Sequence, residues 1–244
     1  MSSSTIRLKH AVSLAADCIS FCLSRILQQL PVFRRKIMHD VGNHNTLRIY
    51  VTRKVTWLYE QKEKQGSPLA TAQLAQLRRG AGDDPANHPG LWEIIFGNNT
   101  DIPQFPKRYL GYNDAVSHGE QATYAAVTLF ALHQQSRSQP MHVPNFRFGT
   151  AVGQLVLQTS ESMKKRFDAL LKARSESARR HYLRSLITLL RSEEIAFDYG
   201  QFAQDYMQLQ NPEKRDAVIL RWSRDFLYGY EPKKSKTSEE TSKN

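Results

Sequence analysis

Apolar residues recur every three or four positions from about residue 49 to residue 230, which is the period of an amphipathic helix. This period predicts a series of helices over residues 51–58, 67–79, 91–96, 120–135, 151–157, 160–171, 179–191, 199–207 and 213–228. No segment alternates apolar and polar residues over more than a few positions, as a half-buried strand would. The expected class is all-α, with two small helical bundles and irregular connecting loops.

The loops divide the chain into four parts. Residues 49–147 form a predicted N-terminal bundle, which contains turn-rich loops at 83–90 and 97–113. Residues 148–230 form a predicted C-terminal bundle. The tail at 231–244 is Lys, Ser, Thr and Glu with no apolar anchor, and it is expected to be disordered.

Residues 1–48 differ in pattern from the rest of the chain. They contain one amphipathic helical segment and a basic cluster at 34–36, and Met38 is an alternative start, so this part is either a natural extension or a start-site artefact. The only two cysteines, Cys18 and Cys22, are four residues apart. They are too close for a helical disulfide and two ligands short of a zinc site, so they are interpreted as small hydrophobic residues in the core or facing a partner.

One helix is expected to end at Arg78-Arg79-Gly80. Leu69, Leu74 and Leu77 give the helix its apolar spacing, and the glycines at 80 and 82 tolerate the left-handed backbone that closes helices. Arginine is well suited to bidentate phosphate contacts. The alternative is an ordinary solvated helix end, where the helix dipole favours basic side chains.

The net charge indicates which class of partner the chain is expected to bind. The chain carries 34 Lys and Arg against 23 Asp and Glu, a formal charge of +11. This excess favours nucleic acid as the first candidate partner and an anionic membrane surface as the second. No segment reaches the roughly 18 uninterrupted apolar residues of a spanning helix, because the longest candidate, 11–30, contains Asp17 and Arg25. A cytoplasmic protein without membrane partner is therefore expected.

Most of this excess lies between residues 164 and 191, where nine basic residues meet two acidic ones. In the second helix of this pair, Arg180, Arg184 and Arg191 share a flank beside the apolar stripe. In the first helix, Lys165 and Lys172 are seven residues apart on the outer face. The stretch is either a solvated face or a surface that binds phosphates without reading bases.

Enzyme motifs are missing from the sequence. There is no phosphate-binding loop, no metalloprotease or hydrolase signature, and no carboxylate cluster for the metal ions of a nuclease. His133 and His142 are candidates for a metal or acid–base pair, but a packed or hydrogen-bonded role is favoured because no carboxylate lies near either in sequence. We expect no enzymatic activity, no metal and no cofactor.

Several short motifs occur in an order that resembles the CasB family, the small subunit of the type I-E CRISPR surveillance complex, Cascade. The resemblance covers roughly residues 50–230. It rests on Leu77-Arg78-Arg79-Gly80-Ala81-Gly82 with Pro89 and Trp92, Phe130-Ala131-Leu132-His133-Gln134-Gln135-Ser136, Met141-His142, Phe148-Gly149, Lys165-Arg166-Phe167 with Leu170-Leu171, Leu183-Arg184 with Leu186-Ile187 and Leu189-Leu190, Asp198-Tyr199, and Arg221-Trp222 with Arg224-Asp225-Phe226.

The resemblance implies a non-catalytic helical protein that holds nucleic acid backbones, because guide RNA pairing reads the sequence. Its implied partners are guide RNA, target DNA including the displaced strand, the large subunit CasA, the backbone subunit CasC and a second copy of the chain. Such a subunit would stabilise the R-loop. The extension at 1–48 departs from the compact start expected of the family.

Charge and resemblance together give the candidate nucleic-acid-binding residues. The resemblance assigns phosphate contact to Arg78, Arg79, Lys165, Arg166 and Arg184, while Lys107 and Arg108 belong to a loop tied to no motif. Tyr199, Trp222 and Phe226 are interpreted as core. The full candidate set is Arg78, Arg79, Lys107, Arg108, Lys164, Lys165, Arg166, Lys172, Arg174, Arg180, Arg184 and Arg191.

Two rival functions remain open at this stage. A freestanding helical nucleic-acid-binding regulator predicts sequence-specific duplex binding by the isolated protein, whereas the Cascade subunit predicts weak, salt-sensitive and sequence-blind binding. A metal-dependent nuclease would degrade nucleic acid until a chelator is added, but the sequence lacks the necessary carboxylates.

Overall fold

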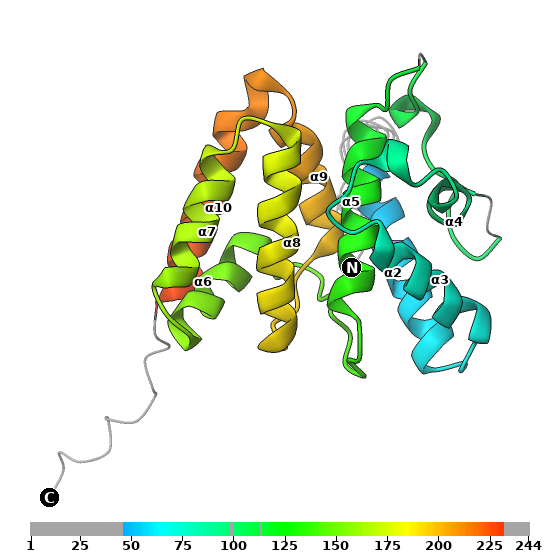
Figure 1. Ribbon diagram of the computed structural model, residues 1–244, viewed down its shortest axis with the longest axis horizontal. Coiled ribbons are helices and arrows are strands. Elements are labelled where there is room, and N and C mark those ends of the chain that lie inside the picture. Colours follow the sequence, from blue (N-terminus) through cyan, green and yellow to red (C-terminus); the bar gives the residue numbers. More distant parts are fainter. Residues whose placement is uncertain (1–45, 98–99, 113, 232–244) are drawn as a thin grey trace, which may run out of the picture. The chain divides into compact units, whose positions relative to one another are not determined.

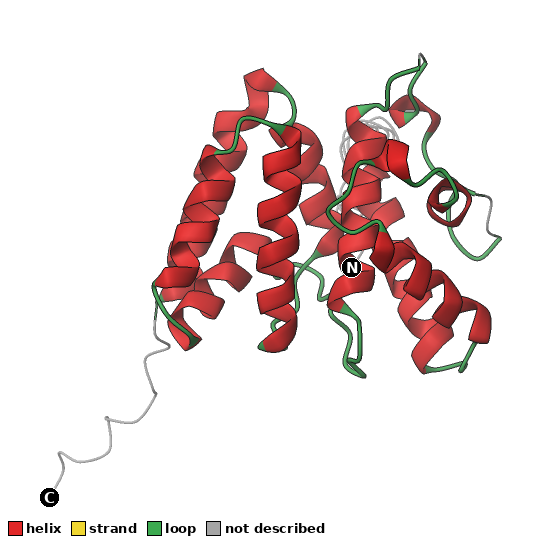
Figure 2. Cartoon of the chain, viewed as in Figure 1, coloured by secondary structure: helices red, strands yellow, loops and turns green. Residues whose placement is uncertain are grey.

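The computed structural model describes residues 46–97, 100–112 and 114–231 (Figure 1). Within these ranges the regular structure is helical, apart from one isolated parallel bridge between His142 and Phe197 (Figure 2). The all-α prediction is confirmed. The expectations for the amphipathic segment, Cys18 and Cys22, and the tail from 232 onward lie outside the described residues.

Every helix predicted from residue 49 onward is present, with ends shifted by a few residues. The α-helices are α2 (Thr46–Glu63), α3 (Pro68–Arg79), α4 (Leu91–Phe96), α5 (His118–His133), α6 (Phe148–Gln158), α7 (Ser162–Lys172), α8 (Glu176–Ser192), α9 (Tyr199–Leu209) and α10 (Pro212–Tyr230). Two short 3-10 turns, η1 (Pro85–Asn87) and η2 (Lys107–Tyr109), lie in the predicted loops. None of these helices is long and apolar enough to cross a membrane.

Side-chain caps explain where most of these helices begin. Ser67, Ser175, Asp198 and Asn211 each accept a hydrogen bond from a backbone N–H in the first turn of α3, α8, α9 and α10. Ser117 begins α5 with a complete capping box, because the Glu120 side chain also accepts the backbone N–H of Ser117. The sequence therefore encodes the helix starts locally.

α5 is the central helix of the fold, and most of its residues are buried. It contacts α2, α3, α8 and α9, so Figure 1 shows it between the α7–α8 side of the molecule and the α2–α4 side. A helix that is apolar around its whole circumference is stable only when covered on all sides. α5 thus contacts both α3 and α8, the helices that carry several of the candidate basic residues.

α6 and α10 lie in direct backbone contact. A Cβ built on Gly153 would stand 2.2 Å from the Phe226 carbonyl oxygen, and one on Gly229 would stand 2.1 Å from the Thr150 carbonyl oxygen. Only glycine allows this approach. The contact holds Trp222 and Phe226 in the core, where they are 1% and 4% exposed, as predicted.

Helices from both predicted bundles also pack on one another. α9 contacts α2 and α5, and Tyr199 is fully buried at this junction, as predicted. Asp198, 1% exposed, accepts hydrogen bonds from the Arg48 guanidinium at 2.7 Å and from the Asn145 backbone N–H at 2.9 Å. A short pairing between the loops that carry Met141 and Phe197 strengthens the junction.

Candidate nucleic-acid interface

The end of α3 differs in detail from the sequence-based expectation. Gly80 has right-handed φ and ψ angles of −81° and −5°, whereas Gly82 has a φ of +82°. Gly80 is instead required by space, since a Cβ there would lie 2.3 Å from the Tyr124 hydroxyl oxygen. Leu74 and Leu77 are buried as predicted, but the prediction that Leu69 belongs to the apolar face was wrong, because its side chain is 65% exposed.

The shared flank of Arg180, Arg184 and Arg191 on α8 faces the end of α3 and the end of α5. The Arg180 guanidinium forms an ion pair with Asp84 at 2.9 Å. The Arg184 guanidinium donates to the Ala81 carbonyl, and its side chain packs over Gly82. The Arg191 guanidinium donates to the Gln135 amide oxygen at 2.6 Å. This flank therefore joins α8 to both neighbours.

Arg78, in the last turn of α3, and Arg191, in the last turn of α8, influence each other electrostatically. Arg78 is half-buried and forms no ion pair among the described residues. Burial and the nearby Arg191 guanidinium lower the pKa of Arg78. Two guanidiniums that influence each other repel, and an anion bound beside them would relieve that repulsion.

α7 extends this positive surface. The Arg166 guanidinium donates to the Ser185 hydroxyl on α8. Lys165 and Lys172 are exposed and contact no acidic side chain among the described residues, as their predicted outer position requires. Lys164 differs, because it is ion-paired with Asp168 at 2.8 Å. The candidate Arg79 is exposed and lines a separate pocket with His88 and Leu91. We name the combined surface of the other residues the basic face; it comprises Arg78, Lys165, Arg166, Lys172, Arg180, Arg184 and Arg191.

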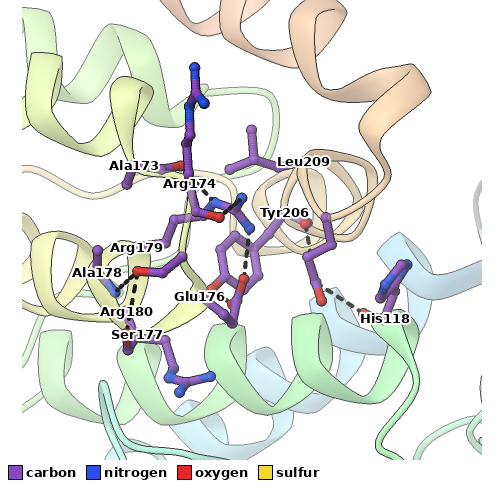
Figure 3. A network of polar contacts seen from close by, with 12 residues as sticks. His118, Ala173, Arg174, Glu176, Ser177, Ala178, Arg179, Arg180, Tyr206 and Leu209 are labelled. Carbon is purple, nitrogen blue, oxygen red and sulfur yellow. Dashed lines mark hydrogen bonds and ion pairs between the residues drawn. The ribbon is translucent and has the colours of Figure 1, made fainter.

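The turn between α7 and α8 holds one arginine inward and one outward (Figure 3). Arg179 is 3% exposed and donates to Glu176 at 2.8 Å and to the Ala173 and Arg174 carbonyls at 3.2 and 3.1 Å. The positive charge of Arg179 is therefore paired with Glu176 within the fold. Arg174, in contrast, is exposed, and its side chain extends away from this network.

The candidates Lys107 and Arg108 lie apart from the basic face. They form the 3-10 turn η2, next to the start of α5. Arg108 lines a pocket of about 290 Å³ together with His118 and Lys214. The structure thus separates the candidate set into a main group on α3, α7 and α8 and a second group at η2. Lys214 was not singled out from the sequence, because its neighbours in the pocket come from distant parts of the chain.

The two candidate histidines have a structural role. The His133 Nδ1 lies 3.0 Å from the Tyr199 hydroxyl, and the His142 Nδ1 accepts the Tyr199 backbone N–H at 3.1 Å. Burial lowers the pKa of His133 to about 3 and also lowers the pKa of His142. The packed, hydrogen-bonded interpretation is confirmed. No group of three or more potential metal ligands occurs within the described ranges.

Comparisons with known proteins agree with this architecture. The family model of CRISPR-associated protein Cse2 matches residues 73–227, which is more than half of the chain. The crystal structure of CasB from Thermobifida fusca matches with a TM-score of 0.60 and 30% sequence identity, covering 74% of this chain and 97% of that chain. No curated protein sequence matches significantly.

Two further structures share the fold at lower identity. A Cse2-family CRISPR-associated protein from Thermus thermophilus matches with a TM-score of 0.53 at 24% identity, over 73% of this chain and 97% of that one. A chain of a CRISPR RNA-guided surveillance complex matches with a TM-score of 0.52 at 20% identity, over 74% of this chain and 95% of that one. The family match and the Thermobifida structure together establish that the chain belongs to the Cse2, or CasB, family of CRISPR-associated proteins.

Proposed function

We propose that this chain is the non-catalytic small subunit of a Cascade-type CRISPR surveillance complex. Its basic face holds the phosphate backbones of guide RNA and of target DNA, including the displaced strand, without reading their sequence. Its proposed neighbours are the large subunit CasA, the backbone subunit CasC and a second copy of the chain. In this role the protein stabilises the R-loop.

The observation that carries this proposal is that Arg78, Arg184 and Arg191 form no ion pair with a described acidic residue. Neutral hydrogen bonds, from Arg191 to Gln135 and from Arg184 to the Ala81 carbonyl, fix the direction of the neighbouring side chains without neutralising them. A fixed set of cations suits a phosphate backbone, which carries one negative charge on each nucleotide.

The character of the side chains on the basic face supports backbone contact over base reading. Arginine and lysine predominate, and the other exposed positions in the middle of α8 are His181 and Thr188. Proteins that bind single strands through stacked bases use exposed aromatic platforms. The aromatic side chains of the C-terminal helices are instead mostly in the core, as Phe167 and Trp222 are.

The comparisons support the assignment to a complex. The matching chain at 20% identity shares the fold and comes from an assembly described as a CRISPR RNA-guided surveillance complex. Family membership rests on independent matches at higher identity. In such a complex, base pairing with the guide RNA identifies the target. A subunit with a basic face then needs only to hold the nucleic acid backbones.

Charge reversal on α7 tests the proposal. Lys165 and Lys172 contact no acidic partner among the described residues, so the double variant Lys165→Glu/Lys172→Glu should fold normally. We expect it to bind a fluorescein-labelled mixed-sequence single strand about tenfold more weakly than the wild type. The slope of log affinity against log salt should fall by about 0.7 for each phosphate that the variant no longer neutralises. Fluorescence anisotropy over a salt series measures both quantities.

A matched control changes the same amount of charge elsewhere. Arg53 on α2 and Arg224 on α10 are exposed and form no ion pair with a described residue, so Arg53→Glu/Arg224→Glu should leave the salt slope unchanged. Equal weakening by the two double variants would show that net charge alone governs binding and would contradict the proposal. Strong preference of the isolated protein for one duplex sequence would favour a freestanding regulator.

A further inference from the structure

A groove lies between α2, α3 and α4. Its volume is about 600 Å³, and its lining includes Lys54, Trp57, Leu69, Gln73 and Ile94. In Figure 1 these helices occupy the side of the molecule opposite α7 and α10. Lys165, Arg166 and Lys172, which are the α7 part of the basic face, therefore lie on the other side of the molecule from the groove.

Lys54 is a buried cation without an anionic partner among the described residues. Its side chain is 4% exposed, and its ammonium forms no hydrogen bond or ion pair with any of them. The nearest favourable neighbour is the Trp57 ring, whose centroid lies 5.6 Å from Nζ. Burial lowers the pKa of Lys54 to about 8. Buried charges in folded proteins are ordinarily paired, so this ammonium is exceptional.

Two further groups in the groove lack partners within the described part of the chain. The Gln73 Oε1 atom is buried without a hydrogen bond. Leu69 is 65% exposed although it belongs to a helix that packs two other leucines into the core. The groove thus combines an unpaired cation and an exposed apolar side chain within one hollow, and one of its lining residues, Gln73, has a buried acceptor without a partner.

We propose that this groove binds a segment of a different protein subunit, which presents a carboxylate to Lys54 and an apolar side chain to Leu69. The identity of the partner as a subunit rests on the proposed function. An Asp or Glu side chain would form a charge-assisted hydrogen bond with the ammonium. The apolar side chain would cover Leu69 and Ile94.

The charges around the groove favour a peptide carboxylate over a nucleic acid strand. Glu93 lies on its exposed rim, and Asp101 accepts the Trp57 indole N–H at 3.1 Å nearby. A continuous phosphate backbone would meet these acids as well as Lys54. A single carboxylate on an otherwise apolar segment would reach the cation and avoid the rim.

Photo-crosslinking in the assembled complex identifies the segment that lies in the groove. A photoreactive p-benzoylphenylalanine is placed at position 69 of the full chain, and the complex is purified with its guide RNA. We expect crosslinks to one segment of another protein subunit that contains Asp or Glu beside an apolar residue. The matched control places the same group at Leu220, which is 50% exposed on α10, and it should not capture that segment. Crosslinks to nucleic acid, to residues 1–45 or to a second copy would overturn the proposal.

A charge-neutral substitution measures the contribution of the ammonium. Lys54→Met keeps an unbranched side chain that is one atom shorter and removes its charge. We expect this variant to leave the complex about ten- to a hundredfold more readily, as is typical when a charged hydrogen bond is removed. The isolated variant should bind the single-stranded oligonucleotide as the wild type does, so failure of this proposal is separable from failure of the proposed function. Wild-type retention of Lys54→Met in the complex would contradict the proposal.

Discussion

Lys54 shows how one residue can depart from the pattern of its helix for a reason visible only in three dimensions. Leu47, Tyr50, Val51, Val55 and Leu58 are all buried in α2, and the same spacing places position 54 on their face. The sequence therefore contained the signal, a lysine at a core position. The burial of Lys54 is nevertheless not predicted from this signal, because a lysine in an amphipathic helix is usually solvated.

The buried ammonium should lower the stability of the isolated protein. Lys54 has a pKa of about 8 in the folded state and 10.5 when solvated, so the unfolded state binds more protons between these pH values. The free energy of unfolding should rise as the pH increases from 8 to 10.5, and the full penalty applies below pH 8. Lys54→Met should raise the free energy of unfolding at pH 7 by up to about 3 kcal/mol. Urea unfolding at several pH values measures this.

The difference between the wild type and Lys54→Met should shrink as the pH rises towards 10.5. Arg53→Met, on the exposed side of the same helix, is the control and should not alter the pH dependence. A wild type that loses stability relative to Lys54→Met between pH 8 and 10.5 would show that the ammonium is paired in the folded protein.

At the scale of the element, the contact between α6 and α10 depends on glycine. A methyl group on Gly153 would overlap the Phe226 carbonyl and would stand 2.8 Å from the Tyr230 backbone nitrogen. Gly153→Ala should therefore lower the free energy of unfolding by about 3 kcal/mol, although alanine favours helices over glycine by about 1 kcal/mol. Thermal or urea unfolding followed by circular dichroism measures the change.

Gly90 provides a matched control for this substitution. It precedes α4 with helical φ and ψ angles of −64° and −15°, and a Cβ there would have no neighbour within 4 Å. Gly90→Ala should change stability by less than about 0.5 kcal/mol. Similar destabilisation by the two variants would mean that the α6–α10 contact is looser than the structure shows.

Helices were predictable because their signals are local. Ser67, Ser117 and Asp198 begin helices with side chains that the sequence displays directly, and apolar spacing identified the buried faces. The exception at the end of α3 is instructive. The sequence pattern predicts a left-handed backbone at Gly80 as well as at Gly82, but only Gly82 adopts it. Gly80 is needed for its close approach to Tyr124, which lies forty-four residues further along the chain.

At the scale of the whole molecule, the packing of α9 on α2 and α5 should make the two predicted bundles unfold together. The chain has three tryptophans. Trp57 and Trp92 report on the N-terminal half, and Trp222 on the C-terminal half. In Trp57→Phe/Trp92→Phe and in Trp222→Phe, the fluorescence midpoint in urea should coincide with the circular dichroism midpoint of the same variant. Separated midpoints in either variant would show that the halves are independent domains.

Long-range partners limited how much the sequence could predict about the basic face. The excess of positive charge at 164–191 and the outward position of Lys165 and Lys172 followed from composition and period. The ion pair between Arg180 and Asp84 did not, because it joins residues 96 positions apart. The burial of Arg179 is not predictable from the sequence either, because its three hydrogen bonds form only when the turn between α7 and α8 closes.

Arg184 makes genetic dissection of this protein difficult. Its guanidinium holds the Ala81 carbonyl and its methylene groups cover Gly82, while part of the side chain remains on the exposed face. A substitution at this position gives one phenotype with two causes, a weakened fold and a weakened surface. Substitutions that weaken the surface without weakening the fold must therefore be made in α7. There Lys165 and Lys172 form no ion pair with a described side chain.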